Sequence, residues 1–500
     1  MKFWAIAFIT VAVVFANDEG EDEDQAVLKK AEEILLTHNE GPDKNWIREQ
    51  REAMASLTLR RSKFSRAEKP ENPELEAKLA EYRNSVGPKS NITSEEEGDE
   101  RPVSPDATEE LSGIAIEGDM ILSSGQIDNL LNPGGNGNKR RKRSATTDPK
   151  AYWSPDESIP FFVESGLNRT RILQAVKFWQ DNTCLNFVES RTAGSNRLRF
   201  FRGSGCWSYV GKQAFGSQDI SIGQGCDSIG TICHEMAHSL GFYHTQSRYD
   251  RDDYLDINFG NIQSSLQYNF DKLTSQAETH FGMPYDYGSV MQYNPYAFAL
   301  DSNVPTSLAK DPNYQNMMGQ RESPAFSDVK QMNLVYKCAA RCPSTIRCSN
   351  GGIINPNDCT KCICPKYFSG DTCDFLGKAT APVCNGQLIQ ATNRSFTTFK
   401  AQTGLGITYQ YTDAVECFYS IMSPPGTRIQ IQIRNLDASC MESCPWAGFE
   451  INMGTPDLAG MLVCCPEAYK RAYTSVSNQI LIRGVSKYNN VAMDISYRVV

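Results

Sequence analysis

The distribution of apolar and polar positions divides the 500-residue chain into a short apolar start, a polar region and a long folded part. After a basic Met-Lys start, about 12 largely apolar residues lead to the small residue Ala16, a pattern typical of a cleaved signal peptide. This run is shorter than the ~20 residues that span a bilayer, and no later apolar run reaches that length. Residues 17–143 are polar and contain no cysteine, with helical composition from Leu28 to Arg61. We therefore expect a secreted chain without a membrane span, whose residues 1–16 are removed.

The spacing of apolar residues differs between two parts of the remaining sequence. Residues 172–181 have helical spacing, whereas 198–201 and 218–222 read as short strands, so helices and strands are mixed after residue 144. Residues 384–500 show only short alternating strands separated by turn residues, with 428–433 and 494–497 as examples. The pattern predicts an α+β unit followed by an all-β unit, which makes a multidomain chain.

Cysteine usage and charge narrow the class of protein. All 17 cysteines lie between Cys184 and Cys465, as expected for a disulfide-bonded protein of an oxidising compartment. The net charge of −9 originates largely in the polar N-terminal region, and no basic patch contains interleaved aromatic residues, which argues against nucleic acid as a partner. Three Asn-x-Ser/Thr sequences are candidate glycosylation sites: Asn91, Asn168 and Asn393.

The strongest chemical signal is the run His-Glu-Met-Ala-His-Ser-Leu-Gly-Phe-Tyr-His at residues 234–244, which holds three of the five histidines. On a helix, His234 and His238 project from one face, because they are four residues apart. Gly241 allows the backbone to end the helix and to bring His244 back toward them. Three imidazoles with a fourth position left open describe a catalytic rather than a structural zinc site.

Together with Ser289-Val290-Met291-Gln292-Tyr293, the run from His234 to Asp253 closely resembles the astacin family of zinc endopeptidases. The resemblance implies a two-lobed metzincin fold over residues 144–338 and one Zn²⁺ held by the three histidines. It also implies that Tyr293 is an additional zinc ligand and that Met291 forms an apolar floor beneath the metal. The strand at 218–222 would be the edge strand that pairs with an extended substrate.

The family mechanism assigns roles to further residues. Glu235 would take the proton of the zinc-bound water and pass it to the leaving amine. Tyr293 would leave the metal and hydrogen-bond the developing oxyanion. Arg321 lies where several astacins place an arginine in the first primed-side pocket, so it would select an acidic residue after the scissile bond.

The polar N-terminal region resembles an astacin propeptide. Its basic run, Lys139 to Arg143, predicts cleavage between Arg143 and Ser144 by a furin-like processing protease. Ile116-Glu117-Gly118-Asp119 resembles the family motif in which an aspartate, here Asp119, occupies the open zinc position of the latent precursor, although the family usually has Phe where this chain has Ile116.

The cysteines after the protease unit indicate two further modules. By resemblance, residues 339–378 form an epidermal-growth-factor-like module and 384–500 a CUB β-sandwich. The family patterns imply six disulfides: Cys184–Cys338, Cys206–Cys226, Cys342–Cys359, Cys348–Cys362, Cys364–Cys373 and Cys384–Cys417. The pairing of Cys440, Cys444, Cys464 and Cys465 stays open. Cys233 is left over, and we expect a buried free thiol rather than a fourth metal ligand, because on a helix it projects about 100° away from His234.

One residue departs from the family pattern, and one other function class competes. Many astacins carry Glu after the third histidine, where it engages the new N-terminus of the mature enzyme, whereas this chain has Thr245. Together with the single EGF-like and CUB modules, this resembles nematode members of the family and implies extracellular protein substrates such as cuticle, eggshell or matrix proteins. The alternative is a non-enzymatic adhesion protein that acts through these two modules; retention of Glu235, the three histidines and Tyr293 favours the enzyme.

Overall fold

The computed structural model describes residues 46, 48–49, 54, 115–123, 126–127 and 149–500, apart from short gaps in the last range at 193–195, 215, 276–279, 344–345, 410–412, 441–443, 445–446 and 466–470. The predicted signal peptide, the basic run with Arg143 and Ser144, the site at Asn91 and most of the predicted helix at 28–61 lie outside the described residues. Within the described part of the chain, no helix is long and apolar enough to cross a membrane.

The protease unit is built on a six-stranded mixed sheet with the order β1-β5-β6-β4-β2-β3. Its strands are β1 (Met120–Ile121), β2 (Ser158–Val163), β3 (Asn186–Glu189), β4 (Arg197–Phe201), β5 (Cys206–Tyr209) and β6 (Ser217–Ile222). The prediction that 218–222 forms an edge strand is wrong. β6 is an inner strand between β4 and β5, and β5 pairs on its other side with β1, which comes from the region before residue 143.

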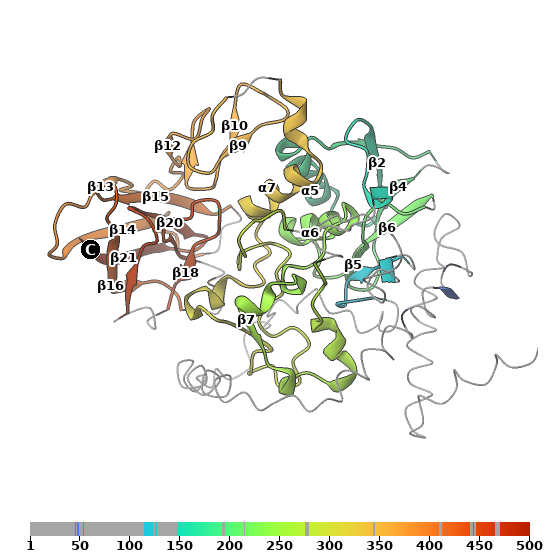
Figure 1. Ribbon diagram of the computed structural model, residues 1–500, viewed down its shortest axis with the longest axis horizontal. Helices are drawn as coiled ribbons and strands as arrows, with labels where there is room; N and C mark the ends of the chain where they lie inside the picture. Colours follow the sequence, from blue (N-terminus) through green and yellow to red (C-terminus); the bar gives the residue numbers. More distant parts are fainter. Residues whose placement is uncertain are drawn as a thin grey trace, which may run out of the picture.

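Three α-helices pack in the protease unit, where they lie between the sheet and the C-terminal strands in Figure 1. They are α5 (Arg169–Asn182), α6 (Ile229–Ser239) and α7 (Phe326–Val335). α5 buries Ile172, Ala175, Val176 and Trp179, which recur at helical spacing and therefore line one face. Trp179 also donates a hydrogen bond of 3.1 Å to the backbone carbonyl of Cys233 in α6, which ties the two helices together.

The second lobe consists mainly of turns and short 3₁₀ helices. Two strands pair here, β7 (Leu255–Ile257) and β8 (Ser307–Ala309).

Among its described residues, the whole protease unit has these 3₁₀ helices: η2 (Pro149–Ala151), η3 (Thr245–Ser247), η4 (Arg251–Asp253), η5 (Phe259–Asn261), η6 (Ser264–Phe270), η7 (Pro312–Met317) and η8 (Cys338–Arg341).

A small module with little regular structure follows the protease unit. It has two two-stranded sheets, β9 (Ile353–Ile354) with β10 (Cys362–Ile363) and β11 (Phe368–Ser369) with β12 (Phe375–Leu376). Three disulfides hold it, and they are the pairs that the resemblance implied: Cys342–Cys359, Cys348–Cys362 and Cys364–Cys373. Such a small core depends on its covalent bridges.

The chain ends in a β-sandwich of a five-stranded and a four-stranded sheet, as the alternating pattern predicted. The first sheet has the order β13 (Leu388–Gln390), β15 (Val415–Met422), β20 (Gln479–Ser486), β17 (Ala447–Asn452) and β18 (Met461–Val463). The second has the order β14 (Thr397–Gly404), β21 (Asn490–Val499), β16 (Ile429–Asp437) and β19 (Ala472–Thr474). Alternate residues of β16, such as Ile429, Ile431 and Ile433, are buried in the core between the sheets.

The remaining cysteines complete the covalent frame. Cys184–Cys338, Cys206–Cys226 and Cys384–Cys417 are joined as the resemblance implied. The pairs left open by the sequence are Cys440–Cys465 and Cys444–Cys464. Cys233 is free and buried, as expected.

Candidate metal centre and active site

Helix α6 carries the first two histidines into the interior. Its N-terminus is capped by Ser228, whose hydroxyl accepts a hydrogen bond of 3.0 Å from the backbone N–H of Thr231. Every residue of α6 after Ile229 is buried, including His234, Glu235 and His238. The helix ends at Ser239 with Leu240 as its C-cap, and Gly241 follows with a φ of +97°, which is accessible to glycine at little cost. The turn after it returns the chain toward the helix and brings His244 to the same point.

The Nε2 atoms of the three histidines converge. His238 Nε2 lies 3.1 Å from His234 Nε2, and His244 Nε2 lies 3.3 Å from His234 Nε2. Three nitrogen ligands at 2.0–2.1 Å from a tetrahedral zinc ion lie about 3.3–3.4 Å apart. The spacing of the imidazoles therefore fits zinc.

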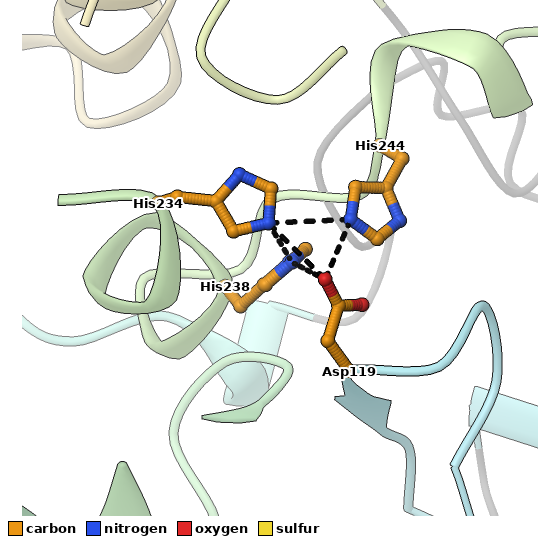
Figure 2. Close-up of side chains that lie close together, drawn as sticks. All are labelled: Asp119, His234, His238 and His244. Carbon is orange, nitrogen blue, oxygen red and sulfur yellow. Dashed lines mark hydrogen bonds and ion pairs between the residues drawn. The ribbon is translucent and has the colours of Figure 1, made fainter. Parts of the chain in front are cut away.

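A fourth side chain enters this cluster from the region before residue 143. Figure 2 shows the carboxylate of Asp119 pointing at the three imidazoles. Its Oδ2 atom lies 3.3 Å from His234 Nε2, 3.8 Å from His238 Nε2 and 3.1 Å from His244 Nε2. All four side chains are buried, and one ligand atom of each lies within 4.8 Å of the others. Asp119 thus forms, with the three histidines, a cluster of four side chains that could hold a metal ion.

The other ring nitrogen of each histidine has its own acceptor. His234 Nδ1 lies 2.7 Å from the carbonyl of Val290, and His238 Nδ1 lies 2.8 Å from the carbonyl of Phe242. His244 Nδ1 lies 2.7 Å from the Glu117 carboxylate. An acceptor at Nδ1 places the proton there and leaves Nε2 free as a ligand atom, which orients all three rings toward the metal.

Glu117 also contacts the candidate site, which sequence reasoning missed although the residue lies inside the motif that identified Asp119. Besides His244, it contacts Gln246 Nε2 at 3.4 Å through its carboxylate, and its backbone N–H donates a hydrogen bond of 2.8 Å to Asn269. Its backbone carbonyl accepts a hydrogen bond from the Tyr293 hydroxyl. The residue expected to stabilise the oxyanion is therefore engaged by the segment that also supplies Asp119.

Electrostatics are consistent with a charged Asp119. Burial alone would raise the pKa of its carboxyl, but His244, His234 and His238 outweigh burial and hold the pKa well below its usual range. For His244, burial lowers the pKa, whereas Asp119 and Glu117 raise it to about 9. A charged carboxylate therefore lies against the three imidazoles, and a metal ion bound there would displace the proton of His244.

The segment around Met291 is held by buried carboxylates. Asp328 in α7 accepts hydrogen bonds from the Ser289 hydroxyl at 2.6 Å and from the Val290 N–H at 2.8 Å. Met291 is buried in the main core beside α6. Thr245, the departure from the family pattern, donates a hydrogen bond of 3.0 Å to Ser289 and so belongs to the same network.

The region before residue 143 also covers the edge of the sheet. β1 pairs with β5 in parallel, with Met120 opposite Ser208 and Ile121 opposite Tyr209. An apolar cluster surrounds this pairing and consists of Met54, Ile116, Met120, Leu122, Ile127, Val210, Tyr243 and Leu273. Ile116 is only 3% exposed in it, so this residue fills an apolar position although the family usually has Phe there.

Arg321 lies close to the site but outside the cluster. Its guanidinium donates hydrogen bonds of 3.0 Å to the carbonyls of Gln292, next to Tyr293, and of Gln320. Its backbone packs on the start of α6, since a Cβ atom at Gly230 would lie 2.1 Å from the Arg321 carbonyl oxygen.

Of the three candidate glycosylation sites, Asn168 and Asn393 lie in the described part of the chain, and both are exposed.

Comparisons with known proteins agree with this site. Residues 145–337 match the family profile of Astacin (Peptidase family M12A). The chain is 41% identical over 424 residues to zinc metalloproteinase nas-28 of Caenorhabditis elegans, covering 83% of each chain. It is 35% identical over 385 residues to blastula protease 10 of Paracentrotus lividus, covering 73% of this chain and 61% of that one. Among solved structures, high choriolytic enzyme 1, a hatching enzyme zinc-protease from Oryzias latipes, is 30% identical with a TM-score of 0.36, covering 39% of this chain and 99% of that chain. The chain therefore belongs to the astacin family of zinc metalloproteinases and is a peptidase.

Proposed function

We propose that this protein is a secreted endopeptidase that is synthesised as a latent precursor and hydrolyses extracellular proteins. The proposed organisation is a signal peptide at 1–16, a propeptide at 17–143, a protease domain at 144–338, an EGF-like module at 339–378 and a CUB module at 384–500. The observation that carries latency is the position of Asp119 Oδ2, within 3.8 Å of the Nε2 atoms of all three histidines.

His234, His238 and His244 would hold one zinc ion, and in the precursor Asp119 would be its fourth ligand. Bound zinc lowers the pKa of a coordinated water toward ~7 and polarises the scissile carbonyl. With Asp119 in place, no position is open for that water. Latency is therefore a consequence of ligand occupancy at the site itself.

Activation in this proposal begins with cleavage between Arg143 and Ser144 by a furin-like protease. The cut separates the segment that carries Glu117, Asp119 and β1 from the protease domain. Its release frees the fourth position, the Tyr293 hydroxyl and the edge of β5. An extended substrate would then pair with β5, because this edge offers unpaired backbone groups.

Two residues act on the reacting groups during hydrolysis, one by transferring a proton and one by stabilising the oxyanion. Glu235 accepts the proton of the attacking water and gives it to the leaving amine, so that its carboxylate is regenerated. The Tyr293 hydroxyl donates a hydrogen bond to the oxygen that becomes negative when the carbonyl is attacked. Arg321 donates a hydrogen bond to the carbonyl of Gln292, the residue before Tyr293, and would pair with a carboxylate just after the scissile bond.

The test is the activity of precursors that cannot be processed, with residues 139–143 replaced by serine. We expect the Asp119→Ala precursor to hydrolyse casein and the Asp119→Asn precursor to be less latent than wild type, because a neutral amide is a weaker zinc ligand. Each activity should disappear with 1,10-phenanthroline and in a matched Glu235→Ala variant. If the Asp119→Ala precursor is silent but becomes active when its propeptide is removed, latency arises from coverage of the cleft rather than from Asp119. If the mature wild-type protein hydrolyses no protein substrate, the proposed function is wrong.

A further inference from the structure

A loop of the C-terminal sandwich lies against the segment that contains Met291. We call residues 286–293 the turn segment and residues 453–460, which join β17 to β18, the sandwich loop. The backbone N–H of Ala459 in the sandwich loop points at the carboxylate of Asp286, 3.3 Å from Oδ1 and 3.2 Å from Oδ2. Asp286 is buried and also accepts hydrogen bonds from Ser327 at 2.6 Å and from the Gly288 N–H at 2.9 Å. One carboxylate thus joins the sandwich, helix α7 and the turn segment.

The approach of the two segments is close enough to require a glycine. A Cβ atom at Gly288 would lie 2.4 Å from the Cβ atom of Ala459, well inside van der Waals contact. Apolar side chains continue this contact, since Ala459 and Leu462 pack against a cluster that includes Tyr287 and Met317. An ion pair of 2.9 Å between Lys330 of α7 and Asp457 lies beside it.

The sandwich loop is itself held firmly. The Gly460 N–H donates a hydrogen bond of 3.0 Å to the carboxylate of Glu450, which also accepts one of 2.7 Å from Tyr367 of the small disulfide-bonded module. Arg483 lies 3.1 Å from the same carboxylate, and both side chains are almost fully buried. A fixed loop transmits a displacement to its neighbour rather than absorbing it.

A short path leads from Asp286 to the metal ligands. The carbonyl of Asp286 accepts a hydrogen bond of 3.2 Å from the Ser289 N–H. The next residue, Val290, is the acceptor for His234 Nδ1 at 2.7 Å. The position of the turn segment therefore sets the orientation of His234, an outer contact of the kind that orients metal ligands.

We propose that the C-terminal sandwich is a structural part of the catalytic unit, in which Ala459 and Asp286 position the turn segment beneath the metal site. Asp286 is a positioning residue, since it acts through the turn segment. The inference rests on the proposed peptidase mechanism. It predicts that the sandwich loop controls kcat even for substrates too short to reach the sandwich.

The test uses the full chain, processed to the mature form, with a short fluorogenic peptide as substrate. In Gly288→Ala the new methyl group meets Ala459, and we expect kcat to fall between about 10- and 100-fold with KM little changed. The double variant Gly288→Ala/Ala459→Gly removes the contact with Ala459. It leaves a contact of 2.9 Å with Cε of Met317, the end of a flexible side chain that can move, so most of the lost kcat should be recovered. Gly260→Ala is the matched control, because the nearest atom to its Cβ lies 3.4 Å away, and it should behave as wild type.

A second readout does not depend on turnover. Backbone amide exchange of peptides covering 286–293 is measured on the metal-free protein. The exchange should be faster in Gly288→Ala than in wild type, and the double variant should show the wild-type exchange rate again. Wild-type kcat in Gly288→Ala would overturn the proposal, as would a loss that Ala459→Gly does not relieve. A change in KM for large protein substrates alone would mean that the sandwich recruits substrate instead. Inactive wild-type enzyme would refute the peptidase function and not this coupling, because the exchange measurement would still report on it.

Discussion

The carboxylate of Glu117 lies 2.7 Å from Nδ1 of His244, and both side chains are buried. The segment at residues 115–123 therefore contacts the candidate metal site twice. Asp119 faces the ligand atoms, and Glu117 accepts the proton on the opposite nitrogen of His244. Carboxylate acceptors behind a metal-bound imidazole strengthen metal binding, so the precursor should hold zinc more firmly than the mature enzyme does.

Replacement of Glu117 by alanine should weaken zinc binding in the precursor by about 10- to 100-fold, the usual effect of removing such a partner. Competition with a chromophoric chelator measures this affinity. The mature enzyme made from the same variant is the control, because it no longer contains residue 117. Equal zinc affinity in the two precursors would show that this contact is without effect on the metal.

Replacement of Tyr293 by phenylalanine should reduce kcat of the mature enzyme by about 10²–10³-fold and leave the zinc content near one per chain. The hydroxyl is removed, but the ring retains its packing against His244, with ring centroids 4.5 Å apart. Steady-state kinetics and metal analysis on the same sample test this. If the zinc content falls instead, Tyr293 is a structural ligand and not a stabiliser of the oxyanion.

Arg321 should select acidic residues just after the scissile bond. Cleavage of a peptide library by the mature enzyme should show enrichment of Asp and Glu there, and Arg321→Ala should abolish the enrichment. Arg321→Lys is a matched control that keeps the charge but loses the bidentate geometry, so a weaker preference is expected. An unchanged profile in Arg321→Ala would mean that the guanidinium serves only its hydrogen bonds to Gln292 and Gln320.

Asp328 should make stability depend on pH. Burial raises its pKa from 3.8 to about 6, against the opposing effect of its hydrogen bonds from Ser289 and Val290. Between these two values the folded protein holds a proton that the unfolded chain has released. Stability from this group is therefore present below pH 3.8 and is lost as the pH rises through 6. The loss amounts to about 3 kcal/mol at most.

This pH effect is measured as a difference between wild type and Asp328→Asn, which has no carboxyl at this position, so that other titrating groups cancel. The unfolding free energy of wild type relative to the variant should decrease between pH 4 and pH 7. Parallel pH profiles for the two proteins would contradict the assignment of a raised pKa to Asp328.

Cys233 should be unreactive in the folded protein. It is fully buried, and burial raises the pKa of its thiol, so that the reactive thiolate is scarce. A thiol reagent should detect no free thiol in the native chain and one after denaturation without reductant. Reaction of the native protein at the rate of a free thiol would contradict this burial.

The metal ligands could be predicted from the sequence because their geometry is local. His234 and His238 are one helical turn apart, and Gly241 marks the end of that helix. The contact between Glu117 and His244 could not be predicted in this way, because 127 residues separate them and no periodicity connects the turn at Glu117 with the turn after α6 that carries His244. It also depends on the left-handed backbone of Glu117, with φ of +56°, which no neighbouring residue type signals.

The error about the edge strand has a physical cause. Both β5 and β6 are fully buried, so their residue patterns do not reveal which of the two lies nearer the edge of the sheet. The contact between Asp286 and Ala459 could not be predicted from the sequence either, because these two residues belong to different modules and are 173 residues apart in the chain. Alternation along residues 428–433, by contrast, reports directly on the two faces of β16.

The Cys184–Cys338 bridge has a consequence for how the precursor comes apart. It closes a loop with a sequence separation of 154, and this loop contains Glu235, Tyr293 and all three histidines. Residues 17–143 contain no cysteine, so their covalent connection to this ring is the peptide chain alone. In the proposed activation, a cut at Arg143 would make inhibitor and enzyme two molecules in a reversible binding equilibrium. Dilution would then favour the free enzyme, and a high local concentration of the released segment would restore inhibition.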